Sequence, residues 1–448
     1  MKINIPFIAN LIIEKLYEKG FEAFVVGGCV RDSLLGIKPK DWDITTSAKP
    51  NQVIEIFKDK YNVIETGIKH GTVTLIDENK NPYEITTYRI EGEYEKNRKP
   101  KSVEFTSSIK EDLKRRDFTI NAMAYNYKEG LIDYFSGEED LKNKIIKCVG
   151  NPSDRFEEDA LRIMRAFRFR ARYNDFILDE NLLNAASDKA YLLKNISVER
   201  IREEINQIIT TNPSILSLLK QKGILDYIIP ELKIIYDCPQ NNKYHIFDVW
   251  NHTIEAMKNS EPDLEIRLSL LLHDIGKPLC KVTDEKGIDS FYCHPKESKN
   301  IANGLLKRLK YDNKTIEKVT NFIEYHDSDI SSSRDIKRML NKLGEKDFRK
   351  LLKVKYGDLS ARNPEFAQEK IEKLKKVEDT LDTILKKDEC YSMSQLKVNG
   401  EDLKHIGIKE GKAIGHMLNV LLDMVIQDNS LNTKEKLLKI VRERSKCY

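Results

Sequence analysis

The sequence lacks the cysteine pattern of a disulfide-stabilised protein or a cysteine-rich zinc protein. Its seven cysteines are odd in number and none has Cys-x-x-Cys spacing, which argues against both kinds of site. No apolar run approaches the roughly 18 residues that a transmembrane helix needs. The start of the chain carries charged residues in an amphipathic pattern, unlike a signal peptide. These absences predict a protein of the reducing cytoplasm that has no membrane span.

The chain also lacks a strong excess of charge, low-complexity tracts and sustained repeats. A net charge of +4 on 448 residues neither demonstrates nor excludes a nucleic-acid partner. The content of 40% hydrophobic and 33% charged residues is typical of a globular protein, and the length favours about three domains. Strand and helix patterns mix over residues 1–150, whereas nearly everything later is helical. The expected fold class is therefore α+β, with a small mixed sheet followed by helices.

A glycine-rich turn is followed by two closely spaced aspartates. The apolar run 24–26 predicts a buried strand, and Gly27 and Gly28 then open a short helical pattern, so backbone N–H groups can face a phosphate. Asp41 and Asp43 begin the next strand pattern two residues apart, which puts both carboxylates on one face. Such pairs hold Mg²⁺ in phosphoryl or nucleotidyl transfer. A surface turn with solvated aspartates is the alternative.

These residues resemble the first motif of the class II tRNA nucleotidyltransferase and bacterial poly(A) polymerase family, members of the polymerase-β-like nucleotidyltransferases. Strand patterns at 61–66, 71–76 and 83–90 agree with the small mixed sheet that the resemblance implies. Glu84 alternates with apolar neighbours in the last of them. Because the family carries an acidic residue at this place, Glu84 is expected to be the third catalytic carboxylate. A solvent-facing edge glutamate is the alternative.

The stretch Lys-Arg-Arg-Asp-Phe-Thr-Ile-Asn is similar to the family's second signature. On an expected helix, Asp117 and Asn121 share a face that suits hydrogen bonding to a ribose, and Arg115 and Arg116 offer charge to phosphates. Local capping and salt bridging are the alternatives. The charged residues 91–101 are expected to form a mobile loop, in which Arg98 and Pro100 fit the family's pattern.

The third signature places Asp159 and Arg162 one helical turn apart. A carboxylate beside a guanidinium resembles the family's template-free base selector, in which protein side chains distinguish CTP from ATP. An ordinary ion pair is the alternative. Later arginines at helical spacing form either a phosphate-binding stripe or a solvated face. The expected nucleotide-binding residues are Gly27, Gly28, Arg31, Arg116, Asp117, Asn121, Asp159, Arg162, Arg165 and Arg168.

Five of the eight histidines fall between residues 245 and 326. His252, the pair His273 and Asp274, His294 and His326 accompany apolar helix patterns. Imidazoles on apolar helices need polar partners, and a buried metal supplies several at once. The order His, His-Asp and a distant Asp resembles the HD phosphohydrolase superfamily.

The distant ligand that we favour is Asp358, with Asp327 and Asp329 as competitors. His294 and His326 would be auxiliary ligands or phosphate contacts, and His245 stays unassigned. The mixture of His and Asp suits a divalent transition metal, Mn, Fe, Ni, Co or Zn, better than Mg²⁺ alone.

The combined resemblance implies a nucleotidyltransferase head at 1–150, an elongated helical neck with the base-selecting helix at 151–235, an HD domain at 236–365 and a helical, tRNA-binding tail at 366–448. It implies template-free addition of CCA to tRNA 3′ ends from CTP and ATP, with Mg²⁺ in the head and a second, hydrolytic activity in the HD domain. No obligatory protein partner is expected. An A-adding enzyme or a poly(A) polymerase carries the same motifs, and an HD nucleotide phosphohydrolase with an RNA-binding head is the alternative of another class.

Overall fold

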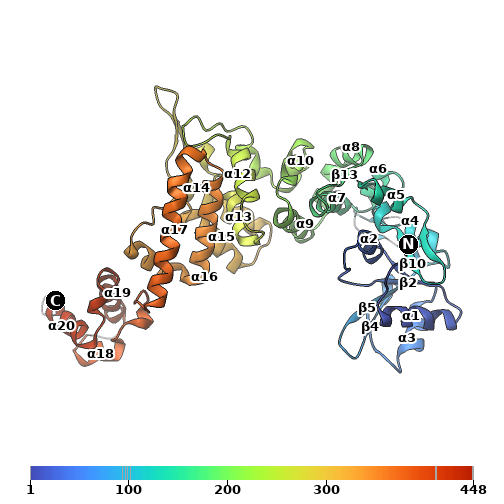
Figure 1. The fold of residues 1–448 in the computed structure, drawn as a ribbon, viewed down its shortest axis with the longest axis horizontal. Coiled ribbons are helices and arrows are strands. Elements are labelled where there is room, and N and C mark those ends of the chain that lie inside the picture. Colours follow the sequence, from blue (N-terminus) through green and yellow to red (C-terminus); the bar gives the residue numbers. More distant parts are fainter. Residues whose placement is uncertain are drawn as a thin grey trace. The chain divides into compact units, whose positions relative to one another are not determined.

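The computed structural model describes residues 2–92, 94–95, 97, 99–100, 102–408 and 411–445. The chain forms two compact units, Met1–Pro230 and Glu231–Tyr448 (Figure 1). Among the described residues, no helix combines the length and the hydrophobicity needed to cross a membrane. The finer boundaries expected at residues 150, 235 and 365 stay predictions.

The first unit contains the expected mixed sheet, which has seven strands in the order β11-β10-β1-β2-β5-β4-β3. Strands β2 and β5 are parallel and all other neighbours are antiparallel. Strand β1 is buried along its whole length, as its apolar sequence requires. The strands are β1 (Ala23–Val26), β2 (Ile44–Thr46), β3 (Asn62–Gly67), β4 (Thr72–Ile76), β5 (Pro82–Thr87), β10 (Met123–Asn126) and β11 (Gly130–Asp133).

Short elements surround this sheet. Helices α1 (Phe7–Glu18), α2 (Gly28–Leu34) and α3 (Pro50–Phe57) contact its strands. Within the stretch expected to be a loop, β7 (Tyr94–Glu95) pairs with β8 (Lys99–Pro100), while β6 (Arg89–Glu91) pairs with β9 (Val103–Phe105). Arg98 lies outside the described residues.

Two helix predictions in this unit are wrong. Asp117 and Asn121 share no helix, because α4 (Ile109–Lys114) ends before them and Phe118 is extended, bridging to Cys148. Asn121 instead ends a short 3₁₀ turn, η2 (Thr119–Asn121). Asp159 and Arg162 are likewise separated: Asp159 caps α6 (Pro152–Glu158) in an extended conformation, with φ −132° and ψ 103°, and α7 (Leu161–Arg172) starts afterwards.

The rest of the first unit is mainly helical, with a short parallel pair formed by β12 (Ile145–Ile146) and β13 (Ile177–Leu178). The apolar face of α7 buries Ile163, Ala166 and Phe167, and α7 contacts α9 (Val198–Thr211). Further helices are α5 (Gly137–Lys142), α8 (Glu180–Asp188), α10 (Ile215–Gln221) and α11 (Leu225–Ile228).

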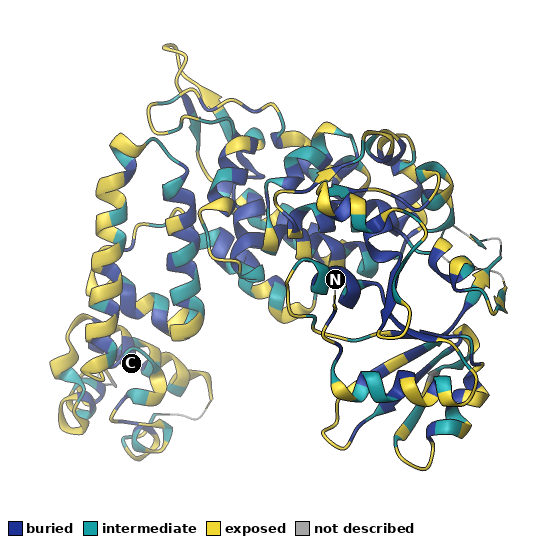
Figure 2. Ribbon diagram, turned by 45° about the vertical axis from the view of Figure 1, so that its right-hand side comes forward, coloured by how far each residue is buried: buried dark blue, intermediate teal, exposed yellow. Residues whose placement is uncertain are grey.

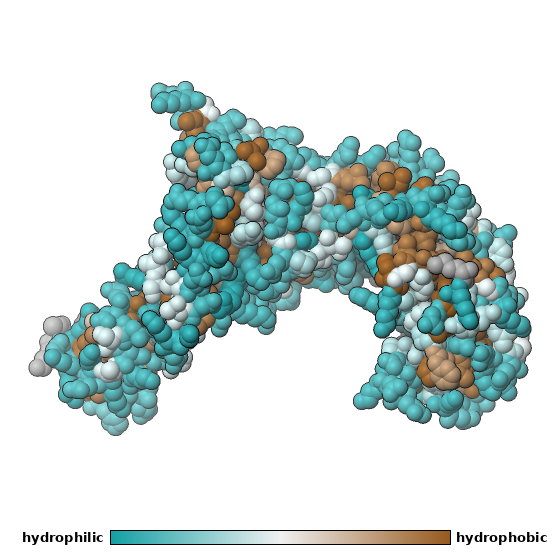
Figure 3. Space-filling model, viewed as in Figure 1, coloured by the Kyte–Doolittle hydropathy of each residue, from teal (hydrophilic) through white to brown (hydrophobic). Residues whose placement is uncertain are grey.

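The second unit consists of packed helices and one β-hairpin, and its buried residues gather on the faces that the helices turn toward one another (Figure 2). Its elements are α12 (Val249–Lys258), α13 (Leu264–Leu272), β14 (Lys281–Thr283), β15 (Asp289–Phe291), α14 (His294–Arg308), α15 (Asn313–Tyr325), α16 (Ser333–Ser360), α17 (Pro364–Lys386), α18 (Gly400–His405), α19 (Lys412–Gln427) and α20 (Lys434–Ser445). The last three share a separate core that includes Leu403, Leu421 and Val441. The face visible in Figure 3 is mostly hydrophilic.

Candidate functional site

Asp43 immediately precedes β2 and Glu84 lies within β5, each one residue before a residue of the parallel pair Ile44 and Ile85. Ile44 of β2 pairs with Ile85 of β5, so the preceding residue on each chain segment lies at the same end of the strand pair. Asp41 and Asp43 precede β2 instead of lying within it as expected, because pairing with β5 begins at Ile44.

The charges of Glu84 and Asp41 act on Asp43. Desolvation by the surrounding protein, followed by the charges of Glu84 and Asp41, raises the pKa of Asp43, and Arg116 opposes the shift. In the described part of the chain the three carboxylates are not all gathered within 4.8 Å. A divalent cation would relieve their repulsion, and carboxylate oxygens are the ligands that Mg²⁺ prefers. The donor types therefore suit the expected Mg²⁺, while the three carboxylates are not assembled as a metal site in the described part of the chain.

Arg116 lies against the glycine turn after β1. Gly27 has φ +78°, and a Cβ at this position would come within 2.7 Å of Arg116 Nη1. Arg116 Nη2 lies 3.7 Å from Asp112 Oδ2, and its buried Nε has no hydrogen-bond partner among the described residues. Burial lowers the pKa of Arg116, while Asp112 and Asp43 oppose this. A guanidinium with a spare donor beside a glycine turn suits a phosphate group.

Asp117 and Asn121 contact each other even without a shared helix. Asn121 Nδ2 donates to Asp117 Oδ1 at 3.0 Å, and Arg165 donates to Asp117 Oδ2 at 2.8 and 2.6 Å. Although burial opposes it, Arg165 and Asn121 lower the pKa of Asp117 to about 2. Asn121 Oδ1 accepts from Arg31. The two residues expected to contact a ribose are thus bonded to protein groups in this structure.

The side chains of Asp159 and Arg162 do not bond to each other, although the Arg162 main-chain N–H donates to the Asp159 carbonyl at 3.0 Å. Asp159 Oδ2 accepts from Arg200 at 3.0 Å, while Arg162 donates to Glu158 at 2.5 Å and to the Arg115 carbonyl at 2.9 Å. Both nevertheless line one cavity of about 410 Å³. The other residues lining it are His70, Arg89, Glu91, Tyr94, Arg115, Arg116, Asp117, Arg165 and Arg200.

Arg31 and Arg168 line a second, smaller cavity of about 220 Å³. Arg31 pairs with Asp32 at 2.7 Å, and Arg168 pairs with Glu204 at 3.1 Å. These two arginines therefore line a different cavity from Arg162 and Arg165, although Arg31, Arg165 and Arg168 all lie 5.0–5.8 Å from the centre of the Phe169 ring.

Several of the residues that line the larger cavity were not identified by any sequence motif. Arg200 comes from α9, and Arg89 belongs to the short β6 strand. Arg89 and Arg115 both contact Glu91, at 2.7 and 3.3 Å. Only the folded chain brings these groups together.

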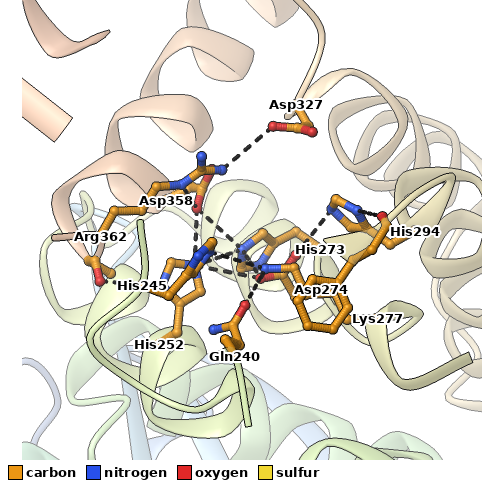
Figure 4. A network of polar contacts seen from close by, with 12 residues as sticks. Gln240, His245, His252, His273, Asp274, Lys277, His294, Asp327, Asp358 and Arg362 are labelled. Carbon is orange, nitrogen blue, oxygen red and sulfur yellow. Dashed lines mark hydrogen bonds and ion pairs between the residues drawn. The ribbon is translucent and has the colours of Figure 1, made fainter. Parts of the chain in front are cut away.

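The expected His and Asp residues of the second unit converge on one buried centre (Figure 4). His252 Nε2 lies 3.0 Å from Asp358 Oδ1 and 3.4 Å from His273 Nε2. Asp274 is shared, since its Oδ2 lies 3.2 Å from His273 Nε2 and its Oδ1 lies 3.3 Å from His294 Nε2. His326 Nε2 completes the centre, 3.2 Å from His294 Nε2. We call these six residues the His/Asp cluster.

The backbone orients all four imidazoles of the His/Asp cluster. Each Nδ1 lies within 2.6–3.3 Å of a main-chain carbonyl oxygen, so a neutral imidazole here carries its proton on Nδ1 and leaves Nε2 for a metal. Burial lowers the pKa of His252 and His326. Although burial opposes it, Asp274 raises the pKa of His273 to about 9. Two subsets each bring three ligand atoms within 4.8 Å: His252, His273 and Asp358, and His273, Asp274 and His326. This donor set fits a divalent transition metal.

Asp358, from α16, enters the cluster in preference to its competitors. Asp327 lies 3.6 Å from Arg362, and Asp329 belongs to neither of the two ligand subsets. The sequence reasoning missed Lys277, whose Nζ lies 2.7 Å from Asp274 Oδ2 and donates to Gln240 Oε1 at 2.7 Å. Its spacing of three residues after Asp274 was an available signal.

Models of three known domain families match the chain. They are the Poly A polymerase head domain over residues 23–147, an RNA and SrmB-binding site of polymerase A over 175–235, and tRNA nucleotidyltransferase domain 2 over 282–441. The CCA-adding enzyme of Ligilactobacillus salivarius is 34% identical over 96% of this chain and 94% of its own length. That of Limosilactobacillus fermentum is 32% identical over 98% and 97%.

Solved structures of CCA-adding enzymes share the fold of this chain. The crystal structure of the Bacillus stearothermophilus CCA-adding enzyme in complex with CTP covers 99% of this chain and 98% of its own, with a TM-score of 0.76 and 27% identity. The Thermotoga maritima CCA-adding enzyme complexed with tRNA shares the fold at 23% identity, with a TM-score of 0.59 over 98% of this chain and 96% of its own. The chain therefore belongs to the class II CCA-adding enzyme family of tRNA nucleotidyltransferases.

Proposed function

We propose that this protein adds CCA to tRNA 3′ ends without a nucleic-acid template, using CTP and ATP. The observation that carries the proposal is the placement of Asp43 just before β2 and of Glu84 within β5, each one residue before the paired residues Ile44 and Ile85, with the charge of Arg116 opposing the rise in the pKa of Asp43. Family membership supports it, as does the CTP bound by the Bacillus stearothermophilus relative. Replacement Asp43→Asn is expected to abolish incorporation of both nucleotides and to leave the fold intact.

In this proposal Asp41, Asp43 and Glu84 hold Mg²⁺. When bound, Mg²⁺ lowers the pKa of the attacking 3′-hydroxyl and neutralises the triphosphate. Arg116 and the N–H of Gly28 contact the phosphates, since the Gly27 N–H already donates to the Met123 carbonyl at 3.0 Å and Arg116 has a buried donor without a partner among the described residues.

The larger cavity receives the nucleoside. Asp117 and Asn121 exchange their present bonds for bonds to the ribose, and Asp159 and Arg162 present a carboxylate and a guanidinium to the base edge. All but Asn121 line this cavity, and Asn121 is bonded to Asp117. An A-adding enzyme or a poly(A) polymerase would use the same groups and is the alternative for this site.

We further propose that the His/Asp cluster binds a divalent transition metal and hydrolyses phosphate esters, as an HD domain does. The supporting observation is that backbone carbonyls turn four Nε2 atoms toward Asp274 and Asp358. In the double variant His273→Ala/Asp274→Ala, metal content and phosphohydrolysis are expected to fall together while nucleotide addition persists. If both are unchanged, this second function is wrong. A protein that is only an HD phosphohydrolase would not need the carboxylates of the first unit.

A further inference from the structure

A cavity of about 370 Å³ borders the His/Asp cluster. His326 and Asp358 form part of its wall, so groups bound in the cavity lie beside the cluster. The volume falls within the range of about 300–1,000 Å³ that small-molecule sites occupy. The cavity therefore suits a compact ligand.

Basic side chains line the same cavity. They are Lys355, Arg362, Lys370 and Lys373. Two of these four are already bonded within the protein. Lys355 donates to three main-chain carbonyls around His326, and Arg362 donates to Asp358 at 2.7 and 3.2 Å. Lys355 and Arg362 therefore stabilise the wall of the cavity, and other residues would bind the ligand.

Lys370 and Lys373 differ from these two because they are exposed and lie one turn apart on α17. Lys373 pairs with Glu369 of its own helix at 2.7 Å, an exposed pair that costs little to break. Lys370 Nζ lies 5.6 Å from the centre of the Tyr244 ring. Two ammonium groups on one face of a helix are thus available to an anion in the cavity.

Acidic side chains line the cavity as well. Asp327 and Asp329 line the cavity, and carboxylates accept hydrogen bonds from hydroxyl groups. A simple inorganic anion would use only the lysines, whereas a phosphate ester that carries hydroxyl groups matches both kinds of wall.

We infer that Lys370 and Lys373 of α17 are the residues that hold the phosphate group of a phosphomonoester bound in this cavity; as a substrate site, the cavity rests on the proposed hydrolytic function of the cluster. Helix α17 follows the last cluster ligand in the chain and supplies none of the ligands. It contributes substrate binding to a centre that other helices build.

The test uses the full-length protein loaded with Mn²⁺ and measures binding of adenosine 5′-monophosphate, with adenosine as the uncharged reference, by calorimetry. In Lys370→Ala/Lys373→Ala, the Kd for the monophosphate is expected to rise about tenfold, because two charged donors are lost, while Mn²⁺ content is unchanged. The control is Lys375→Ala/Lys376→Ala, which removes the same charge from exposed positions of the same helix that do not line the cavity. Binding at the first unit is common to all variants and cancels in the comparison.

The inference is overturned if the wild type does not bind the monophosphate, if the lysine variant binds it as tightly as the wild type, or if the control loses as much affinity. Hydrolysis of the monophosphate is followed in parallel. Lysine-dependent binding without hydrolysis supports the binding site and refutes the hydrolytic function. Hydrolysis whose KM is the same in the wild type and the lysine variant supports the function and refutes the site.

Discussion

Gly27 and Arg116 are packed so closely that a side chain at position 27 would displace the Arg116 guanidinium. A Cβ on Gly27 would lie 2.7 Å from Arg116 Nη1, which is inside van der Waals contact. The turn after β1 and the arginine that follows α4 therefore depend on each other, and the proposed phosphate site includes both.

The replacement Gly27→Ala is expected to displace Arg116 and to weaken CTP binding about tenfold, since a charge-assisted hydrogen bond is lost. Gly36→Ala is the matched control, because Gly36 also has positive φ, +72°, but open space around its Cβ position. Both variants carry the backbone strain of a positive φ, about 1 kcal/mol. Equilibrium dialysis with CTP should therefore separate two variants with similar melting temperatures. Equal CTP affinity in both would remove Arg116 from the phosphate site.

Arg162→Ala is expected to lose discrimination between CTP and ATP more than it loses Mg²⁺ binding. Arg162 also bonds to Glu158 and to the Arg115 carbonyl, so a stability loss of about 1–3 kcal/mol should accompany the change. Arg170→Ala is the control, since Arg170 lies on the same helix and donates to the Asn174 carbonyl. The measurement is the ratio of kcat/KM for the two nucleotides. A uniform loss for CTP and ATP, with an unchanged ratio, would argue against base selection.

The raised pKa of Asp43 has a pH consequence for metal binding. A carboxyl with a raised pKa takes up its proton at higher pH than an ordinary aspartate, and the protonated form does not bind a cation. Affinity for Mn²⁺, used as a probe, should therefore fall on acidification before ordinary aspartates titrate. Glu84→Gln removes a neighbouring negative charge that raises this pKa, so the acid midpoint of binding should move to lower pH even as overall affinity drops. A midpoint that stays in place or rises would show that Glu84 does not act on Asp43.

The choice of Asp358 as a cluster ligand predicts a stability effect. A metal that binds only the folded state stabilises it by mass action, so Mn²⁺ should raise the melting temperature of the wild type. Asp358→Asn should lose most of this rise, whereas Asp327→Asn should keep it, because Asp327 contacts Arg362 and not the histidines. If Asp327→Asn abolishes the rise and Asp358→Asn does not, the ligand assignment is reversed.

Sequence patterns correctly predicted the local structure that is determined by residues close together in the sequence. The apolar run before Gly27, the alternation around Glu84 and the apolar helices that carry His252 and His273 all appear in the structure. In each case the spacing of the apolar residues matches the geometry of the strand or helix, so those residues fall on its buried side.

The sequence patterns failed where one residue leaves the regular conformation. Asp159 is extended and caps α6, whereas Arg162 lies in α7, so a pair spaced for one helical turn does not share a helix. Phe118 does the same between Asp117 and Asn121. Periodicity does not detect a single break of this kind. It also does not find partners such as Arg200, which reaches Asp159 from a different helix.

The most direct test of the account gives the purified protein a tRNA that ends before CCA, with CTP and ATP together, and reads the 3′ ends on a sequencing gel. If the protein adds CCA by means of Asp43, we expect CCA to be completed and extension to stop there, with no product from Asp43→Asn. Addition of A alone to a tRNA already ending in CC, a long adenosine tail, or extension by Asp43→Asn at the wild-type rate would contradict it.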